Sequence, residues 1–124
     1  MKKDIGIIGH GFVGKAVEYG FDTENTAIQI ADPKYGVSVK DLFVVDGFEP
    51  DVVFICVPTP MGHDGSIDAS ILLDVCYQLN EYGNDCVAVI KSTVTPDKLA
   101  ECFEDYDNLV YSTEFLRERT ATED

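Results

Sequence analysis

Three glycines near the amino terminus have the spacing of a phosphate-binding turn. Gly9, Gly11 and Gly14 form the pattern G-x-G-x-x-G directly after the apolar run from Asp4 to Ile8. In such a turn the first glycine permits the sharp change of direction, the second lets the backbone approach a pyrophosphate, and the third allows a helix to pack closely. The N–H groups at the start of that helix can then bind phosphate. The pattern therefore predicts a dinucleotide site.

An acidic residue stands where such a site needs one. Asp32 follows Gly14 by 18 residues, at the end of a second apolar run, from where a carboxylate reaches the ribose 2′-hydroxyl of adenosine. Because a carboxylate there repels a 2′-phosphate, we expect NAD to be preferred to NADP, although Lys34 leaves use of both open. The alternative is that the turn only packs a helix on a sheet and Asp32 only ends a strand. His10 could touch a phosphate, but no partner for it is visible in the sequence and we expect it to face solvent.

The elements that must position these residues alternate between strands and helices. We expect strands at 4–8, 27–31, 52–57, 86–90 and 109–112, and helices at 12–20, 68–82 (beginning at Asp68 or Ala69) and 96–103. Apolar helix positions are expected at Val13, Ala16, Val17 and Tyr19, and at Ile71, Leu72, Val75 and Leu79. The segment 34–51 stays undecided, since 37–43 could be a short helix and 44–45 the stub of a strand. This order predicts an α/β fold: one domain with a Rossmann-type doubly wound parallel sheet, covered on both faces.

The amino-acid composition narrows the classes of partner that the chain can bind. Lys and Arg total 9 against 23 for Asp and Glu, a formal net charge of -14, which argues against nucleic acid and anionic membrane surfaces. No secretory signal or apolar run of about 20 residues is present, so we expect a soluble cytoplasmic protein. The four cysteines lie far apart in apolar segments without ligand spacing, and are expected to be buried, reduced thiols with no metal.

Three further segments extend the pattern beyond a dinucleotide turn. They are V-P-T-P at 57–60 with D-G-S-I-D at 64–68, K-S-T-V-T-P at 91–96, and T-E-F-L-R-E at 113–118. In this order they resemble the UDP-glucose/GDP-mannose 6-dehydrogenase family, and the resemblance spans essentially the whole chain. Such enzymes oxidise the C6 alcohol of a nucleotide sugar to a carboxylate with two NAD, through an aldehyde held on a cysteine thiol. A dehydrogenase of the 6-phosphogluconate or hydroxyacid type, which shares the fold, is a weaker alternative. It is disfavoured by the motifs P-T-P at 58–60, K-S-T at 91–93 and E-F-L-R-E at 114–118.

The resemblance implies site residues. Proton handling and water positioning would fall to Thr93, Glu114 and Glu118. The implied cofactor contacts are Gly9, Gly11, Phe12, Val13, Gly14, Asp32, Lys34, Val57, Pro58, Thr59, Thr93 and Glu118. Without the resemblance, Thr93 could be a helix cap and the two glutamates a solvated helix face.

Departures from the family pattern limit the expected activity. Thr113 stands where the family usually has proline and Arg119 where it usually has glycine, and the segment 34–51 is much shorter than its counterpart. The family's nucleophilic cysteine lies in later domains, and the domain is expected to stop before its last strand. We therefore expect an NAD-binding portion that is inactive alone, with a nucleotide-sugar substrate for the complete enzyme and a homodimer possible. A stand-alone, non-catalytic NAD-binding or nucleotide-binding module is the alternative.

Overall fold

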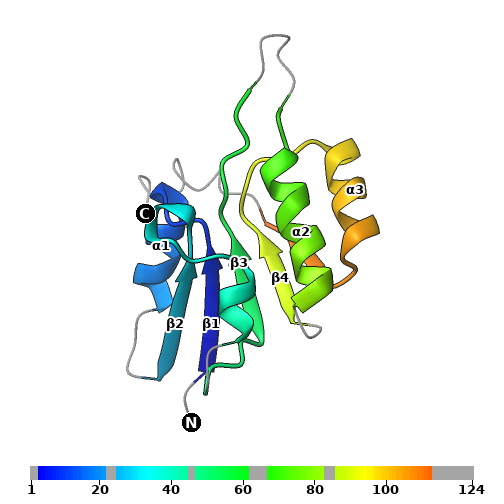
Figure 1. The fold of residues 1–124 in the computed structure, drawn as a ribbon. Helices are drawn as coiled ribbons and strands as arrows, with labels where there is room; N and C mark the ends of the chain where they lie inside the picture. Colours follow the sequence, from blue (N-terminus) through cyan, green and yellow to red (C-terminus); the bar gives the residue numbers. More distant parts are fainter. Residues whose placement is uncertain (1–2, 22–24, 45–46, 62–66, 83–85, 113–124) are drawn as a thin grey trace.

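The computed structural model describes residues 3–21, 25–44, 47–61, 67–82 and 86–112, and strands alternate with helices along them as predicted (Figure 1). The strands are β1 (Lys3–Ile8), β2 (Thr26–Ala31), β3 (Val52–Ile55), β4 (Val87–Ile90) and β5 (Leu109–Tyr111). The helices are α1 (Phe12–Phe21), α2 (Ser70–Tyr82) and α3 (Pro96–Asp105), with short 3-10 helices η1 (Pro33–Tyr35) and η2 (Lys40–Phe43).

The five strands form one sheet in which every neighbouring pair is parallel. Their spatial order is β2-β1-β3-β4-β5. From β1 the chain first moves one way to β2, then crosses back over β1 to β3 and continues the other way. The order therefore reverses between β1 and β3, and ligands of open α/β sheets bind at the carboxyl ends of the strands at such a point.

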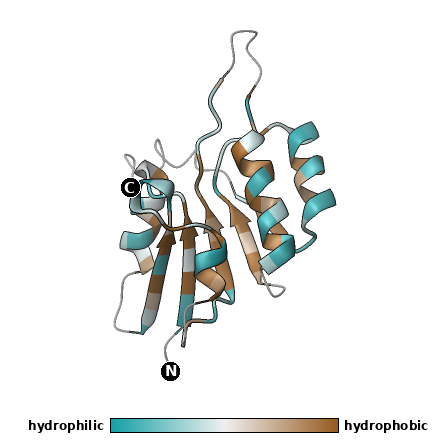
Figure 2. Ribbon diagram, viewed as in Figure 1, coloured by the Kyte–Doolittle hydropathy of each residue, from teal (hydrophilic) through white to brown (hydrophobic). Residues whose placement is uncertain are grey.

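Apolar side chains on the two faces of the sheet build two cores. Along β3, Val53 and Ile55 belong to the larger core, under α2 and α3, whereas Phe54 belongs to a smaller core under α1. This alternation follows from the two-residue period of a strand. Figure 2 shows hydrophobic strands and helices with hydrophilic stripes. The doubly wound fold, with α1 on one face and α2 and α3 on the other, confirms the predicted class.

Two helix predictions need correction. Tyr19 is 88% exposed and Ala16 is also exposed, so Val13 and Val17 alone, among the positions predicted in this helix, form the inner side of α1. In α2, Leu72, Val75 and Leu79 are buried, but Ile71 is 45% exposed. An apolar residue is buried only if its angular position around the helix axis faces the sheet.

The described part of the undecided segment consists of short 3-10 helices and turns. Asp32 caps η1, Gly36 closes it with a left-handed backbone (φ 70°), and η2 follows at the place where a short helix was considered. Leu42 of η2 enters the larger core. Val44, considered as part of a strand stub, is exposed and belongs to no strand, and Val45 lies outside the described residues. Among the described helices, none is long and apolar enough to cross a membrane.

Candidate functional site

A cleft of about 890 Å³ opens at the carboxyl ends of β1, β3 and β4, where the strand order reverses. Its lining includes three of the expected segments: the glycine turn, the end of β2, and the residues that follow β3 and β4. The expected cofactor residues that line it are Gly9, Gly11, Val13, Asp32, Lys34, Val57, Pro58, Thr59 and Thr93. The structure therefore brings together residues up to 84 positions apart (Gly9 to Thr93).

The three glycines of the turn are required for different reasons. Gly9 has a φ of 93°, and a Cβ on it would lie 2.7 Å from the carbonyl oxygen of Cys56. A Cβ on Gly14 would lie 2.1 Å from the carbonyl oxygen of Gly9, so α1 can pack on the turn only with glycine here. By contrast, a Cβ on Gly11 would meet nothing within 4 Å. Gly9 and Gly14 thus build the turn, and Gly11 leaves open space above it.

The start of α1 presents backbone donors beside this open space. Gly11 is the first residue whose carbonyl enters the helical hydrogen-bond ladder, since it accepts the N–H of Lys15 at 3.0 Å. The N–H groups of Phe12, Val13 and Gly14 precede the ladder and have no carbonyl of their own helix to bond. A pyrophosphate is the group that such donors and the positive end of the helix favour.

Asp32 ends β2 and faces the glycine turn. Its Oδ2 accepts the backbone N–H of His10 at 2.6 Å, and its Oδ1 accepts that of Lys34 at 3.0 Å. Burial alone would raise the pKa of this carboxyl, but the two N–H donors and the Lys34 charge together hold the pKa below its usual value. Asp32 is therefore an ionised acceptor whose position is fixed from both sides.

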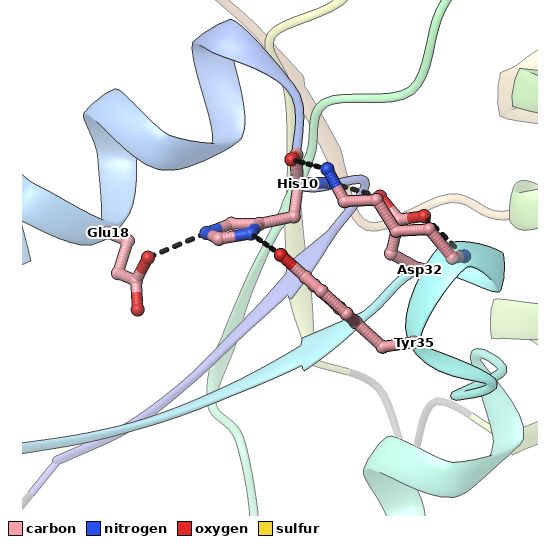
Figure 3. A network of polar contacts seen from close by, with 5 residues as sticks. His10, Glu18, Asp32 and Tyr35 are labelled. Atoms are coloured by element: carbon pink, nitrogen blue, oxygen red, sulfur yellow. Dashed lines mark hydrogen bonds and ion pairs between the residues drawn. The ribbon is translucent and has the colours of Figure 1, made fainter.

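His10 does not face solvent, contrary to the prediction. It is 8% exposed, and its ring lies between Glu18 and Tyr35 (Figure 3). Nε2 is 2.6 Å from Glu18 Oε1 and Nδ1 is 2.7 Å from the Tyr35 hydroxyl. The prediction failed because these partners are 8 and 25 residues away and are joined to the turn only by the fold.

The opposite end of the cleft is built from short side chains that bond to main-chain carbonyls. The Thr59 hydroxyl donates to the carbonyl of Thr93, and the buried Ser92 hydroxyl donates to the carbonyl of Val57, each at 2.7 Å. Thr93 is exposed and is not a helix cap, because Thr95 occupies that position before α3. These bonds tie the segment after β3 to the segment after β4.

Sequence reasoning missed one wall of the cleft. Ile71, Asp74 and Gln78 of α2 line it, and the Gln78 amide donates to Asp74 at 2.7 Å. Their spacing of three and four residues marks one helix stripe next to the buried one, a signal present in the sequence. Glu114 and Glu118, named for proton handling and cofactor contact, lie outside the described residues.

None of the four cysteines offers a thiol in the setting of a nucleophile. Cys76, Cys86 and Cys102 are buried, and burial raises the pKa of the Cys76 and Cys102 thiols, which disfavours the thiolate. Cys56 is half-buried rather than buried as predicted, and its side chain packs against the core under α1. None of the four is in a disulfide, and the described part of the chain contains no cluster suited to a metal ion.

Comparison with known proteins identifies the family of this chain. A family model described as the NAD binding domain of the UDP-glucose/GDP-mannose dehydrogenase family matches residues 44–124, which is 81 of the 124 residues. The chain belongs to this family. As an NAD-binding domain it has the features that the cofactor requires: open space at Gly11, free donors at the start of α1, and an ionised Asp32.

Members of the UDP-glucose/GDP-mannose dehydrogenase family and an uncharacterised protein are among its relatives. UDP-glucose 6-dehydrogenase of Rickettsia felis is 36% identical over 81 residues, covering 60% of this chain and 18% of that protein. An uncharacterised protein of Methanocaldococcus jannaschii is 32% identical over 155 aligned positions, covering 98% of this chain, including the glycine turn that precedes the matched family region, and 17% of that protein. The chain thus spans less than a fifth of these relatives.

Solved structures support the fold across the whole sheet. A UDP-glucose dehydrogenase from Pyrobaculum islandicum superposes with a TM-score of 0.57 at 17% identity, covering 91% of this chain and 35% of that one. At this identity the likeness concerns the fold alone. It includes the amino-terminal part that the family model does not reach, since the matched 91% exceeds the region 44–124.

Proposed function

We propose that this chain is the NAD-binding portion of a nucleotide-sugar 6-dehydrogenase. The complete enzyme would oxidise the C6 alcohol of a UDP-sugar or GDP-sugar, such as UDP-glucose, to the carboxylate. The observation that carries the proposal is one cleft at the reversal of strand order that is lined together by the glycine turn, Asp32 and the segments after β3 and β4. Family membership supports the same assignment.

In this proposal the cofactor lies across the carboxyl ends of the strands. Its pyrophosphate binds above Gly11 at the backbone donors of Phe12, Val13 and Gly14, with Gly9 shaping the turn. Asp32 accepts from the adenosine ribose, and the Lys34 ammonium lies near the negative phosphates. The second ribose and the nicotinamide would reach the other end of the cleft, where they would contact Val57, Pro58, Thr59 and Thr93.

Chemistry would take place at that second end. When held by the segments after β3 and β4, NAD would supply the acceptor for the hydride of the sugar C6. Thr93, Glu114 and Glu118 would handle the alcohol proton, position the hydrolytic water and, for Glu118, contact the cofactor. The thiol that holds the aldehyde is expected outside these 124 residues, because Cys56 packs against the α1 core and the other three thiols are buried.

Calorimetric titration with NAD and NADP tests the cofactor assignment. We expect NAD to bind more tightly than NADP, and Asp32→Ala to weaken NAD by about fivefold to tenfold, since a lost hydrogen bond to a charged acceptor costs about 1 kcal/mol or more. Equal affinities for the two cofactors, unchanged by Asp32→Ala, would contradict the ribose assignment.

Absorbance at the NADH band tests whether the catalytic thiol lies outside these 124 residues. We expect the 124-residue chain with NAD and UDP-glucose, or with GDP-mannose, to form no NADH above background, because three of its four thiols are buried and the proposal places the thiol that holds the aldehyde outside these 124 residues. Robust turnover would show that one of the four cysteines is the nucleophile, and single Cys→Ser variants would identify it.

A further inference from the structure

His10 uses all of its polar groups to join three elements. Its backbone N–H donates to Asp32, and its carbonyl accepts from the Lys34 ammonium. Its ring nitrogens contact Glu18 of α1 and Tyr35 of η1 (Figure 3). One residue of the glycine turn is therefore bonded to the second turn of α1, to the end of β2 and to η1.

The partners fix the form of the imidazole. Glu18 meets Nε2 through a carboxylate oxygen, which accepts hydrogen bonds, so Nε2 carries the hydrogen of this contact. In the neutral ring Nδ1 is then an acceptor, and the Tyr35 hydroxyl donates to it across 2.7 Å. The result is a chain of carboxylate, imidazole and phenol that holds the ring in one orientation.

The same contacts exclude a direct role in binding phosphate. The His10 side chain is 11% exposed, and Glu18 and Tyr35 occupy both ring nitrogens. Turning the ring toward a ligand would break the part-buried contacts with the Glu18 carboxylate and the Tyr35 hydroxyl, and the hydrogen-bond energy of both would be lost. The charged and titratable groups around the ring are Glu18, Tyr35, Lys34 and Asp32, and each is already bonded to His10 or its backbone.

We propose that His10 is a positioning residue for dinucleotide binding, acting through the chain Glu18–His10–Tyr35. The fixed ring sets the direction of the His10 backbone. The backbone N–H then stays bonded to Asp32, and the backbone carbonyl to Lys34, before any ligand binds. The phosphate turn and the ribose acid are thereby held at a fixed spacing, so that binding does not have to order them. This inference rests on the proposed NAD site and adds to it a residue whose ring nitrogens bond to Glu18 and Tyr35 and not to the cofactor.

Calorimetry with NAD and with AMP, at a temperature where every variant is folded, tests the inference. His10→Phe keeps a ring without nitrogens, and Tyr35→Phe removes only the hydroxyl. We expect each to weaken NAD and AMP by the same factor, about fivefold to tenfold, because AMP carries the phosphate and ribose that this spacing serves. Glu18→Gln keeps an acceptor for Nε2 and should retain most of the affinity. Tyr19→Phe, at a tyrosine that is 88% exposed, is the matched control and should change nothing.

A spectroscopic readout separates positioning from general stability. In ¹⁵N spectra of the imidazole, we expect His10 to be the Nε2–H tautomer in the unchanged chain and to lose that preference in Glu18→Leu. A lower thermal midpoint in His10→Phe and Tyr35→Phe with unchanged affinities would overturn the inference, and, if NAD binding still depended on Asp32, would leave the proposed function in place. Failure of the unchanged chain to bind NAD would overturn both.

Discussion

The two ends of the cleft are held by different kinds of contact. At the glycine turn, charged and aromatic side chains bond to one another and to the backbone, with His10 at the centre. At the ends of β3 and β4, the hydroxyls of Thr59 and Ser92 bond only to main-chain carbonyls. The first end is thus formed in advance for one ligand part, adenosine and pyrophosphate. At the second end, the described contacts fix the backbone and do not join charged side chains to one another.

The largest expected effect comes from breaking the turn itself. Gly14→Ala places a methyl group 2.1 Å from the Gly9 carbonyl oxygen, so α1 must move away from the turn and both fold and NAD binding should be lost. Gly11→Ala adds the same methyl group where nothing lies within 4 Å and serves as the control. Circular dichroism and thermal melts check this. Equal melting of the two variants would show that the turn is not built as described.

A second substitution at the same end separates an effect on ligand binding from an effect on folding. Gly11→Val should leave the circular dichroism spectrum and the melting temperature nearly unchanged while weakening NAD by about a hundredfold, because its branched side chain fills the space above the helix start. A binding titration beside the melt decides the matter. Loss of the folded signal together with binding would make Gly11 a structural residue.

Acid should weaken the first end in a predictable pH window. The folded-state pKa of Asp32 lies below its usual value of 3.8, so the stabilisation by its ionised form is present above that value and is lost as the pH falls through the lowered pKa. We expect the unchanged chain to lose more unfolding free energy than Asp32→Asn between about pH 5 and pH 3. Urea unfolding at several pH values measures the difference. Parallel curves for the two proteins would contradict the assigned hydrogen bonds.

The smallest effect is expected at the second end. Thr59→Val removes one hydroxyl bond to the carbonyl of Thr93, so NAD affinity should fall by only about twofold to fivefold. AMP affinity should stay unchanged, since AMP does not reach that end. Titrations with both ligands sharpen the comparison. A loss of AMP affinity equal to that of NAD would mean that the two ends are not independent.

Local patterns in the sequence were enough to predict the framework. The apolar runs predicted all five strands, with bounds that differ from the structure by two residues or fewer. The run of the central strand β3 is nearly all buried, because it has neighbours on both sides and helices on both faces, and such continuous apolar runs are easy to recognise. The glycine turn and Asp32 could also be predicted from local sequence, because the number of residues between them is set by the strand, turn and helix that connect them.

The parts that could not be predicted depend on contacts between distant segments. The orientation of His10 depends on Tyr35, which lies in a short 3-10 helix that has no apolar period of its own. The exposure of Tyr19 and Ile71 depends on where each helix meets the sheet and not on side-chain type. The α2 wall of the cleft exists only because the fold brings that helix beside the glycine turn.

The contact between Gly14 and Gly9 has a consequence for insertions and deletions. Because α1 is seated on the turn with no room for a methyl group, one added residue between these glycines would rotate the helix by about 100° about its axis. Val17 would leave the core under α1, and Glu18 would leave His10. The length of the turn is therefore as constrained as its composition. The stretch between Gly36, which closes η1, and η2 carries none of these contacts with His10, so a change of its length would leave α1 seated on the turn.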